Sequence, residues 1–517
     1  MKELLKTHFG YDAFRPLQED IIAQVLAKKD ALVLMPTGGG KSLCFQLPAL
    51  KFPGLTLVVS PLIALMKDQV DALRANGISA AFLNSSLTPQ EMMEVRQSAE
   101  AGELKLLYVA PERLATAEFQ TMMRSLEISL FAIDEAHCIS EWGHDFRPDY
   151  RNLKSLRRDF PTTPIIALTA TATPIVQRDI EMQLKLSGKT FHASFDRPNL
   201  TYQVEDKKDF FPKILTLLNK YEGQPAIIYC FSRKDTETIA SNLREHKINA
   251  QAYHAGLSPE KRSETQTKFS RDEVSVIVAT IAFGMGIDKP DIRLVIHCTV
   301  PKSLEGYYQE TGRAGRDGLA SDCVLFYSYA DKFKQEFFIK KIKDKEERAQ
   351  SHKKLLQAVD FCQLESCRRA YLLDYFGEEL IMEGESCEGC DRCLDLSAIF
   401  EGISPVEFTE SPRKKRTSKR TSKKSARRTR SIRRKPVELE YDKALFSELS
   451  ALRKRIADER GVPSFVIFGN KSLQEMAHYL PQTKHDFLSI NGVGAQKLES
   501  LGDEFINLIR SYSEAVH

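Results

Sequence analysis

The stretch Thr37-Gly-Gly-Gly-Lys-Ser42 decides how the first part of the chain folds. The apolar run at residues 31–35 predicts a buried strand, and residues 43–47 predict the start of a helix that Pro48 would shorten or bend. A strand, a glycine turn and a helix N-terminus can cradle a triphosphate, because main-chain N–H groups converge on the phosphate oxygens. Met35 stands where the strict phosphate-loop pattern has its first glycine, so a glycine-rich turn without a ligand is the alternative.

A second stretch strengthens the case for nucleotide hydrolysis. Residues 130–133 form an apolar run that ends in Asp134-Glu-Ala-His137. In a phosphate cradle, Lys41 reaches the β- and γ-phosphates and the Ser42 hydroxyl binds Mg²⁺. A carboxylate that ends a strand of the same sheet, here Asp134, can hold Mg²⁺ through water. Glu135 beside it can polarise the attacking water.

Composition and charge limit the class of protein. The 517 residues are 42% hydrophobic and 28% charged, which is typical of a soluble protein with several domains. We find no apolar run long enough to cross a membrane and no secretory signal, so we expect a cytosolic protein. The ten cysteines then indicate thiols or metal ligands rather than disulfides. Residues 413–435 carry 14 Lys/Arg and no acidic residue, which predicts a polyanionic partner at that place.

The order of apolar runs predicts an α/β protein. Strand-like runs alternate with helical segments in two series, which is typical of parallel sheets with functional loops at the carboxyl ends of the strands. In the first series they lie at residues 55–59, 104–109 and 165–168, and in the second at 225–229, 274–279 and 294–297.

The second series has no phosphate loop of its own and carries arginines instead. Gln309-Glu-Thr-Gly-Arg-Ala-Gly-Arg316 places two arginines three residues apart, on one face if this segment is helical. Such arginines can reach across a cleft to a γ-phosphate, or they can end a solvated helix. Upstream, Gln18 could read adenine with its amide while Tyr11 and Arg15 stack on the base, or these residues could form a solvated helix face.

Seven motifs in order resemble those of a RecQ-type DNA helicase of superfamily 2, with two RecA-like domains. The resemblance covers residues 1–396 and resumes at the C-terminus. Its motifs are Phe14-Arg-Pro-Leu-Gln18, residues 37–42, Ser60-Pro-Leu-Ile-Ala-Leu-Met-Lys-Asp-Gln69, Asp134-Glu-Ala-His137, Leu168-Thr-Ala-Thr-Ala172, Phe283-Gly-Met-Gly-Ile-Asp288 and residues 309–316.

The resemblance implies an enzyme that uses ATP and Mg²⁺ to translocate 3′→5′ on single-stranded DNA and to unwind duplex or forked DNA in recombination and repair. It assigns Glu135 as catalytic base and Arg316 as the arginine finger, with Arg313 assisting. The other catalytic candidates are Lys41, Asp134 and His137. The nucleotide would contact Tyr11, Arg15, Gln18, Pro36, Thr37, Gly38, Gly39, Gly40, Lys41, Ser42, Asp134, Gly286, Asp288 and Gln309.

Residues 141–148 are similar to the aromatic-rich loop of that family. Trp142 and Phe146 can stack on any base, and Arg147 can contact a phosphate. The loop follows His137 closely, so contact with DNA could be transmitted to Glu135. A Trp and a Phe buried in the core are the alternative.

Cysteines near residue 390 predict a structural zinc site. Cys387, Cys390 and Cys393 stand at two-residue gaps, and four thiolates make a closed tetrahedral site. Cys367 and Cys362 both lie upstream, and the resemblance favours Cys367. Free thiols are the alternative.

The chain departs from the family pattern after residue 396, where a winged-helix domain would come next. Residues 397–436 are too few for it, and their basic tract is too polar to bury a core. We expect RecA-like domains at 1–200 and 201–335, a helical zinc module at 336–396, a disordered basic linker at 397–436 and an HRDC-like helical bundle at 437–517. Gly492 and Gly494 could present N–H groups to a phosphate or form a plain turn between helices.

The expected partners are single-stranded and forked or duplex DNA, with a single-stranded-DNA-binding protein as a further candidate and no membrane. We expect a cytoplasmic, nucleoid-associated monomer. One rival is an RNA helicase or a DNA-dependent ATPase or remodeller with weak unwinding. Another is a tethering protein with vestigial ATPase activity, against which Lys41, Glu135 and Arg316 argue.

Overall fold

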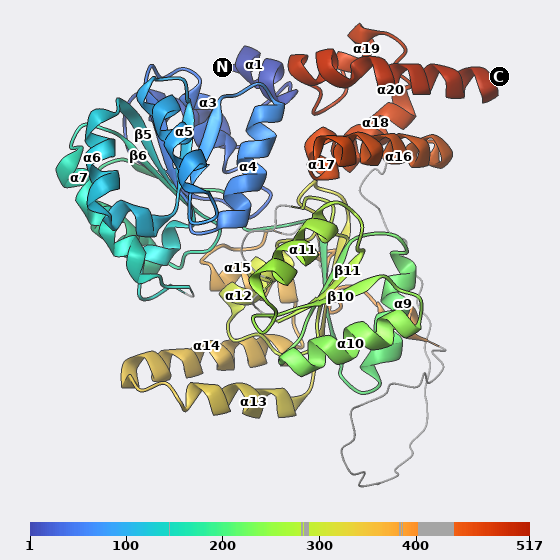
Figure 1. Ribbon diagram of the computed structural model, residues 1–517. Helices are drawn as coiled ribbons and strands as arrows, with labels where there is room; N and C mark the ends of the chain where they lie inside the picture. Colours follow the sequence, from blue (N-terminus) through green and yellow to red (C-terminus); the bar gives the residue numbers. More distant parts are fainter. Residues whose placement is uncertain are drawn as a thin grey trace, which may run out of the picture.

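Two parallel sheets form the body of the computed structural model (Figure 1). The structure describes residues 1–143, 145–280, 283, 289–381, 384, 386–401 and 439–516. The first sheet has the order β3 (Ala80–Leu83), β4 (Leu106–Val109), β2 (Leu55–Val59), β5 (Ile128–Ile133), β6 (Ile165–Thr169), β1 (Ala31–Leu34) and β7 (Lys189–His192). The second has the order β10 (Ala250–Tyr253), β11 (Val276–Ala279), β9 (Ala226–Tyr229), β12 (Leu294–His297), β13 (Ser321–Tyr327) and β8 (Leu200–Asp206).

Helices cover both faces of each sheet, so the central strands are apolar throughout rather than alternating. In the first domain α2, α3 and α4 pack on one face and α6, α7 and α8 on the other. Its helices are α1 (Lys2–Leu4), α2 (Gln18–Leu26), α3 (Leu43–Ala49), α4 (Ile63–Ala75), α5 (Pro89–Glu100), α6 (Ala117–Ser125), α7 (Lys154–Asp159) and α8 (Pro174–Leu184). Those of the second domain are α9 (Phe210–Lys220), α10 (Arg233–Glu245), α11 (Pro259–Ser270) and α12 (Leu304–Thr311).

The cysteine-containing unit and the C-terminal bundle both contact the second domain, and the bundle, at the upper right of Figure 1, also contacts the start of the first domain. The cysteine-containing unit has helices α13 (Tyr329–Ile339), α14 (Lys345–Gln363) and α15 (Arg368–Tyr375), and its core is continuous with that of the second sheet. The C-terminal bundle has a core of its own. Its helices are α16 (Lys443–Arg460), α17 (Ser464–Ile467), α18 (Asn470–Tyr479), α19 (Lys484–Leu488) and α20 (Ala495–Val516).

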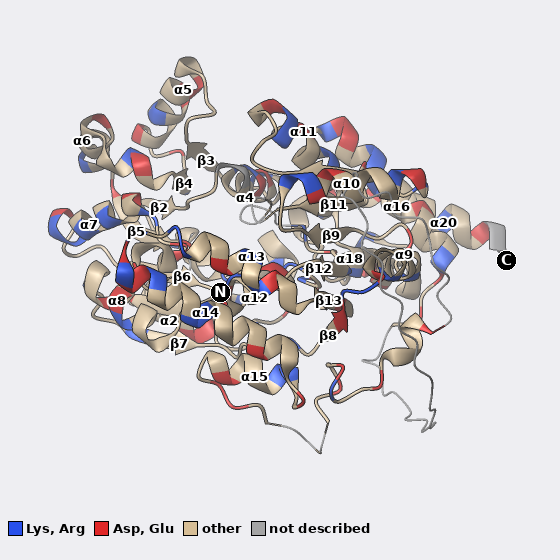
Figure 2. Ribbon diagram, turned by 90° about the horizontal axis from the view of Figure 1, so that it is seen from below, with Lys and Arg blue, Asp and Glu red and all other residues tan. Residues whose placement is uncertain are grey.

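The fold confirms the expected α/β class with two parallel-sheet domains, a cysteine cluster and C-terminal helices. One local expectation is wrong. Helix α12 ends at Thr311, so Arg313 and Arg316 lie in the turns that follow and not on one helical face. The basic tract at 413–435, Gly286 and Asp288 lie outside the described residues. Among those described, no helix is long and apolar enough to cross a lipid bilayer. Acidic and basic residues alternate along the helices of both domains (Figure 2).

Candidate active site

A cavity of about 700 Å³ opens where both domains and the C-terminal bundle meet. Thirteen of the residues expected at a nucleotide site line it: Tyr11, Arg15, Gln18, Thr37, Gly38, Gly40, Lys41, Ser42, Asp134, Glu135, Gln309, Arg313 and Arg316. Pro36 and Gly39 belong to the same loop but do not line the cavity, and His137 is buried behind it. Phe9 and Lys497, 488 positions apart in the chain, therefore contribute to one site.

The phosphate loop is held by side chains that the sequence suggested for base recognition. The Gln18 amide donates to the Gly40 carbonyl at 3.1 Å, and Arg15 donates to the Gly38 carbonyl. The Lys41 Nζ atom donates to the Met35 carbonyl at 2.9 Å. These contacts hold the loop through its carbonyls, and the Gly39 N–H donates to the Pro36 carbonyl at 3.0 Å, so that N–H has to turn away from the loop to meet a phosphate oxygen.

Gly38 allows the two domains to meet at the phosphate loop. Its φ of +79° lies in the left-handed region, and a Cβ there would lie 3.1 Å from the Cα atom of Arg316. The Thr37 hydroxyl donates to the Gly312 carbonyl at 2.8 Å across the same junction. A larger residue at position 38 would push the arginine turn away from the loop.

The acidic pair lies at the carboxyl end of β5, as parallel-sheet sites require. Asp134 accepts from the backbone N–H of Glu135 at 3.0 Å, and Glu135 has left-handed backbone angles (φ 46°, ψ 46°). The Nδ1 atom of His137 lies 3.3 Å from Glu135 Oε2 and 2.8 Å from the Thr169 hydroxyl. The acid is thereby connected through His137 to the end of β6.

Arg197, which the sequence analysis missed, joins the arginine turn to the phosphate loop. Its guanidinium is buried and donates to the carbonyls of Thr37 at 2.7 Å, Ala314 at 3.0 Å and Gly315 at 2.9 Å. Arg313 is also buried, so the solvated helix end is excluded for it. No short sequence motif predicts the role of Arg197, because its partners are backbone atoms far away in the sequence.

The C-terminal bundle forms a third wall of the cavity, which the sequence analysis also missed. Its lining residues are Phe465, Val466, Lys471, Asn491 and Lys497. Burial lowers the pKa of the Lys497 amine to about 8. The Gly492 N–H donates to the Gly10 carbonyl at 3.1 Å. The predicted glycine turn between helices therefore exists, and this N–H is used within the protein rather than by a phosphate.

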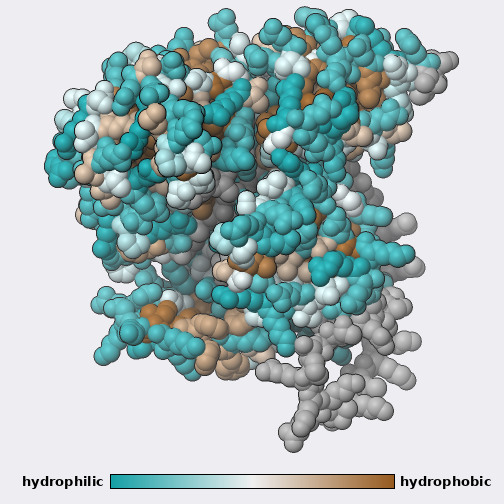
Figure 3. Space-filling view, viewed as in Figure 1, coloured by the Kyte–Doolittle hydropathy of each residue, from teal (hydrophilic) through white to brown (hydrophobic). Residues whose placement is uncertain are grey.

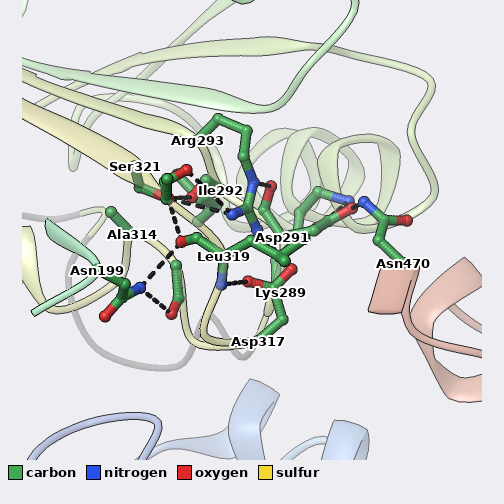
Figure 4. A network of polar contacts seen from close by, with 12 residues as sticks. Asn199, Lys289, Asp291, Ile292, Arg293, Ala314, Asp317, Leu319, Ser321 and Asn470 are labelled. Carbon is green, nitrogen blue, oxygen red and sulfur yellow. Dashed lines mark hydrogen bonds and ion pairs between the residues drawn. The ribbon is translucent and has the colours of Figure 1, made fainter. Parts of the chain in front are cut away.

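A buried polar network connects the bundle to the arginine turn (Figure 4). The Asn470 amide donates to Asp291 Oδ2 at 3.1 Å. Burial opposes the charged form of Asp291, but Lys289, Arg453 and Arg293 hold its pKa below its usual value. Arg293 in turn donates to the Asp291 carbonyl at 2.9 Å and pairs with Asp317 at 2.5 Å. Asp317 directly follows Arg316, so the network leads from the bundle to the predicted arginine finger.

The predicted DNA loop lies at the surface beside the cysteine-containing unit. Trp142 is 47% exposed, which excludes the buried-core alternative for that residue. Lys354 of α14 donates to its carbonyl at 3.3 Å. Phe146 is half-buried under Arg151, and Arg147 pairs with Asp145 at 3.0 Å. Of the three residues predicted to contact DNA here, Trp142 is thus the most exposed.

Four cysteines converge at the edge of the second sheet. The sulfur atoms of Cys367, Cys387, Cys390 and Cys393 all lie within 4.8 Å of one another, with 3.5 Å between Cys387 and Cys390. A tetrahedral zinc site with Zn–S bonds of about 2.3 Å has S–S edges of roughly 3.8 Å. A hydrogen bond from Cys387 lowers the pKa of Cys390 to about 4. Cys362 is buried elsewhere in the core, so the donor set fits Zn²⁺ without it.

Comparison with known proteins decides the family. Family models match at residues 15–179 (DEAD/DEAH box helicase), 206–318 (helicase conserved C-terminal domain), 329–394 (RecQ zinc-binding) and 442–509 (HRDC domain). The ATP-dependent DNA helicase RecQ of Pasteurella multocida is 40% identical over 99% of this chain and 94% of its own. That of Bacillus subtilis is 40% identical over 99% and 98%. The chain belongs to the RecQ family of ATP-dependent DNA helicases.

RecQ membership accounts for the site just described. The family uses ATP and Mg²⁺, and the cysteine cluster falls within the segment that matches the RecQ zinc-binding model. The match to the P. multocida RecQ spans 599 residues whereas this chain has 517, so at least 82 positions of that relative have no counterpart here. This is in keeping with a missing winged helix. A Mycobacterium smegmatis helicase Lhr structure, bound to ssDNA and AMP-PNP, is 23% identical and shares the fold (TM-score 0.52, 64% of this chain and 48% of that chain).

Proposed function

We propose that this RecQ-family helicase couples ATP hydrolysis to 3′→5′ translocation on single-stranded DNA, and so unwinds duplex or forked DNA in recombination and repair. The observation that carries the proposal is the single cavity that both RecA-like domains line. Opening and closing of that cavity with each ATP would move two DNA-contacting domains relative to each other, which is the basic step of translocation. The substrate would be a strand that also reaches the exposed Trp142.

Each group in the cavity has a role in this proposal. Lys41 and the loop N–H groups bind the phosphates, while Ser42 and Asp134 hold Mg²⁺. Glu135 accepts a proton from the attacking water. Arg316, with Arg313, stabilises the charge that develops on the γ-phosphate. Arg197 positions these arginines through the carbonyls of Ala314 and Gly315.

Other parts of the proposal concern zinc and location. One Zn²⁺ per chain, held by Cys367, Cys387, Cys390 and Cys393, would stabilise the second domain without taking part in catalysis. The protein would act as a monomer at the nucleoid, where single-stranded DNA is coated by its binding protein.

Two measurements test the proposed activity. ATPase rates with oligo(dT), oligo(U) and blunt duplex in parallel should rise most with oligo(dT), and only duplexes with a 3′ single-stranded tail should unwind. Lys41→Ala should abolish hydrolysis and leave single-stranded DNA binding largely intact, whereas Lys29→Ala, at an exposed lysine, serves as the matched control. Equal stimulation by RNA, or unwinding from a 5′ tail, would overturn the assignment.

Trp142 offers a direct view of DNA binding, because it is the only tryptophan. Single-stranded DNA should change its emission, and Trp142→Ala should lower the DNA-stimulated ATPase rate more than the basal rate. An emission spectrum that saturating DNA leaves unchanged would remove Trp142 from the proposed DNA path.

A further inference from the structure

Helix α13 carries a row of aromatic rings that the rest of the described chain leaves uncovered. Tyr329, Phe333 and Phe337 follow one another at four-residue intervals and therefore share one side of the helix. They are 53%, 57% and 57% exposed, and Phe338 beside them is 49% exposed. In Figure 3 hydrophobic side chains gather at the lower left, over the α13–α14 hairpin. A contiguous patch of this kind marks an interaction surface.

Lysines are interleaved with these rings. The Nζ atom of Lys341 lies 4.3 Å from the ring centre of Phe337 and 5.3 Å from that of Phe338, and Lys332 lies 5.7 Å from that of Tyr329. Within the part of the chain that the structure describes, Lys340, Lys341 and Lys343 form no ion pair with a carboxylate within 4 Å. Lysine is depleted in protein–protein interfaces, whereas aromatic rings with cations beside them are typical of surfaces that bind single strands.

The position of the row points to the same partner. Glu336 of α13 lies 3.5 Å from His352 of α14, and Lys354, two residues further on, holds the carbonyl of Trp142. At the other side, Phe338 contacts Phe231, which follows β9 at the carboxyl edge of the second sheet, with 5.6 Å between ring centres. Helix α14 thus connects the helix that carries the aromatic row to the Trp142 loop, and the row itself ends beside the edge of the sheet where functional loops are found.

We propose that the α13 face (Tyr329, Phe333, Phe337, Phe338 and Lys341) binds single-stranded DNA without regard to sequence. Bases stack on Phe333 and Phe337, and Lys341 contacts a backbone phosphate. The face lengthens the DNA path beyond the Trp142 loop, in a chain whose residues 397–436 are too few to form a winged helix that would hold the substrate. This inference rests on the proposed activity on single-stranded DNA, but it concerns a surface away from the nucleotide cavity.

Binding of labelled oligo(dT) by fluorescence anisotropy tests the site. Phe333→Ala/Phe337→Ala should bind an oligo(dT) of about 30 nucleotides roughly tenfold more weakly and one of about 10 nucleotides unchanged, because only the longer strand extends beyond the motor. The maximal ATPase rate should stay at the wild-type value. Lys341→Ala should lower the slope of log affinity against log salt by about 0.7. Ile175→Ala/Met182→Ala removes exposed apolar side chains on α8 and is the matched control.

Two further variants keep the result interpretable. Phe333→Leu/Phe337→Leu keeps the face apolar but removes the rings. It should bind the longer oligo(dT) as weakly as the alanine pair if bases stack on the rings. It should bind this DNA as the wild type does if a protein partner uses the face. Phe337→Trp in a Trp142→Phe background should show quenched emission when the longer oligo(dT) binds. Unchanged affinity in the alanine pair, silent emission at saturating DNA, or a wild-type dimer that the alanine pair converts to monomer would overturn the proposal. The emission readout needs no ATP hydrolysis, so it can succeed or fail independently of the proposed helicase activity.

Discussion

The zinc unit and the C-terminal bundle both contact the second domain, but in different ways. Both contain a buried arginine. Arg368 of the zinc unit pairs with Asp391 through two hydrogen bonds of 2.5 and 2.9 Å within its own unit. Arg453 of the bundle donates to the Phe468 carbonyl, to the Asn470 amide oxygen and to the Ser450 hydroxyl, and burial lowers its pKa. The carboxylate that most favours the charged form of Arg453 is Asp291, which belongs to the second domain.

The comparison shows what decides whether a unit can leave its neighbours while it stays folded. The zinc unit shares its apolar core with the second sheet, so its removal would expose that core. The bundle has its own core, and its contacts with the second domain include hydrogen bonds from Asn470 to Asp291 and from Arg271 to the Gly461 carbonyl. Polar contacts exchange with water at little net loss, whereas apolar contacts do not. The zinc unit should therefore unfold together with its domain, and the bundle should be able to leave while folded.

Loss of one zinc ligand should give the largest effect. Cys390→Ala should remove most of the roughly 10 kcal/mol that a structural zinc site can contribute to folding, and should yield metal-poor, unstable protein. Cys298→Ala, at a buried cysteine outside the cluster, is the control. Zinc content and thermal midpoint measured together decide the outcome. A stable Cys390→Ala protein with no zinc would contradict the shared-core argument.

Arg368→Met should follow in size. It leaves Asp391 without its partner, which is expected to lower the free energy of unfolding by about 3–5 kcal/mol. Urea unfolding of the whole chain measures this loss. Adding Asp391→Leu should recover part of it, because the uncompensated charge is then gone. No recovery in the double variant would mean that the arginine stem, and not the ion pair, stabilises the unit.

Asn470→Ala should have a smaller and local effect. It removes the hydrogen bond to the charged Asp291, which should weaken docking of the bundle by about 1.5–3 kcal/mol without unfolding it. Hydrogen exchange at the Gly492 amide, which donates to Gly10 in the docked form, should speed up. Asn470→Asp places a second carboxylate beside Asp291, so it should weaken docking of the bundle more than Asn470→Ala does. If exchange accelerates equally throughout α16–α20, the bundle unfolds rather than leaves, and the contrast with the zinc unit fails.

Lys497→Met should give the smallest effect, and one that depends on pH. With a pKa of about 8, the amine in the cavity is charged at pH 7 and neutral at pH 9. The variant should therefore bind ATP a few-fold more weakly at pH 7 and nearly normally at pH 9. An undocked lysine keeps its proton up to about pH 10, so docking should strengthen between pH 8 and 10. ATP titrations of both proteins at both pH values test this. If the ratio of variant to wild-type affinity for ATP is the same at pH 7 and pH 9, Lys497 does not interact with the nucleotide.

The phosphate loop and the acidic pair could be predicted from sequence because their chemistry is local. Lys41, Ser42, Asp134 and Glu135 belong to short segments whose spacing alone suggests a phosphate cradle. The central strands were also predictable, since burial on both faces makes them apolar throughout. β7 was not, because this edge strand (Lys189-Thr-Phe-His) is half polar and short.

Long-range partners account for what the sequence did not reveal. Arg197 contacts backbone carbonyls, which any sequence supplies. The bundle's share of the cavity depends on docking through single contacts such as Asn470 to Asp291, 179 residues apart. The arginines were found but their local structure was not, because α12 ends before them, at Thr311, and the distant Arg197 bonds to the carbonyls of the turn that follows.

Gly10 and Gly494 give the docked bundle an evolutionary signature. A Cβ at Gly10 would lie 2.4 Å from the Val493 nitrogen, and one at Gly494 would lie 2.6 Å from the Thr7 carbonyl oxygen. Gly10 also has a left-handed φ of +72°, which favours glycine on its own account, whereas only the close approach of the first domain requires Gly494. Lineages in which the bundle no longer rests on the first domain should therefore be free to replace Gly494 but should keep Gly10. A family tree could then be divided into docked and undocked members from one column of an alignment.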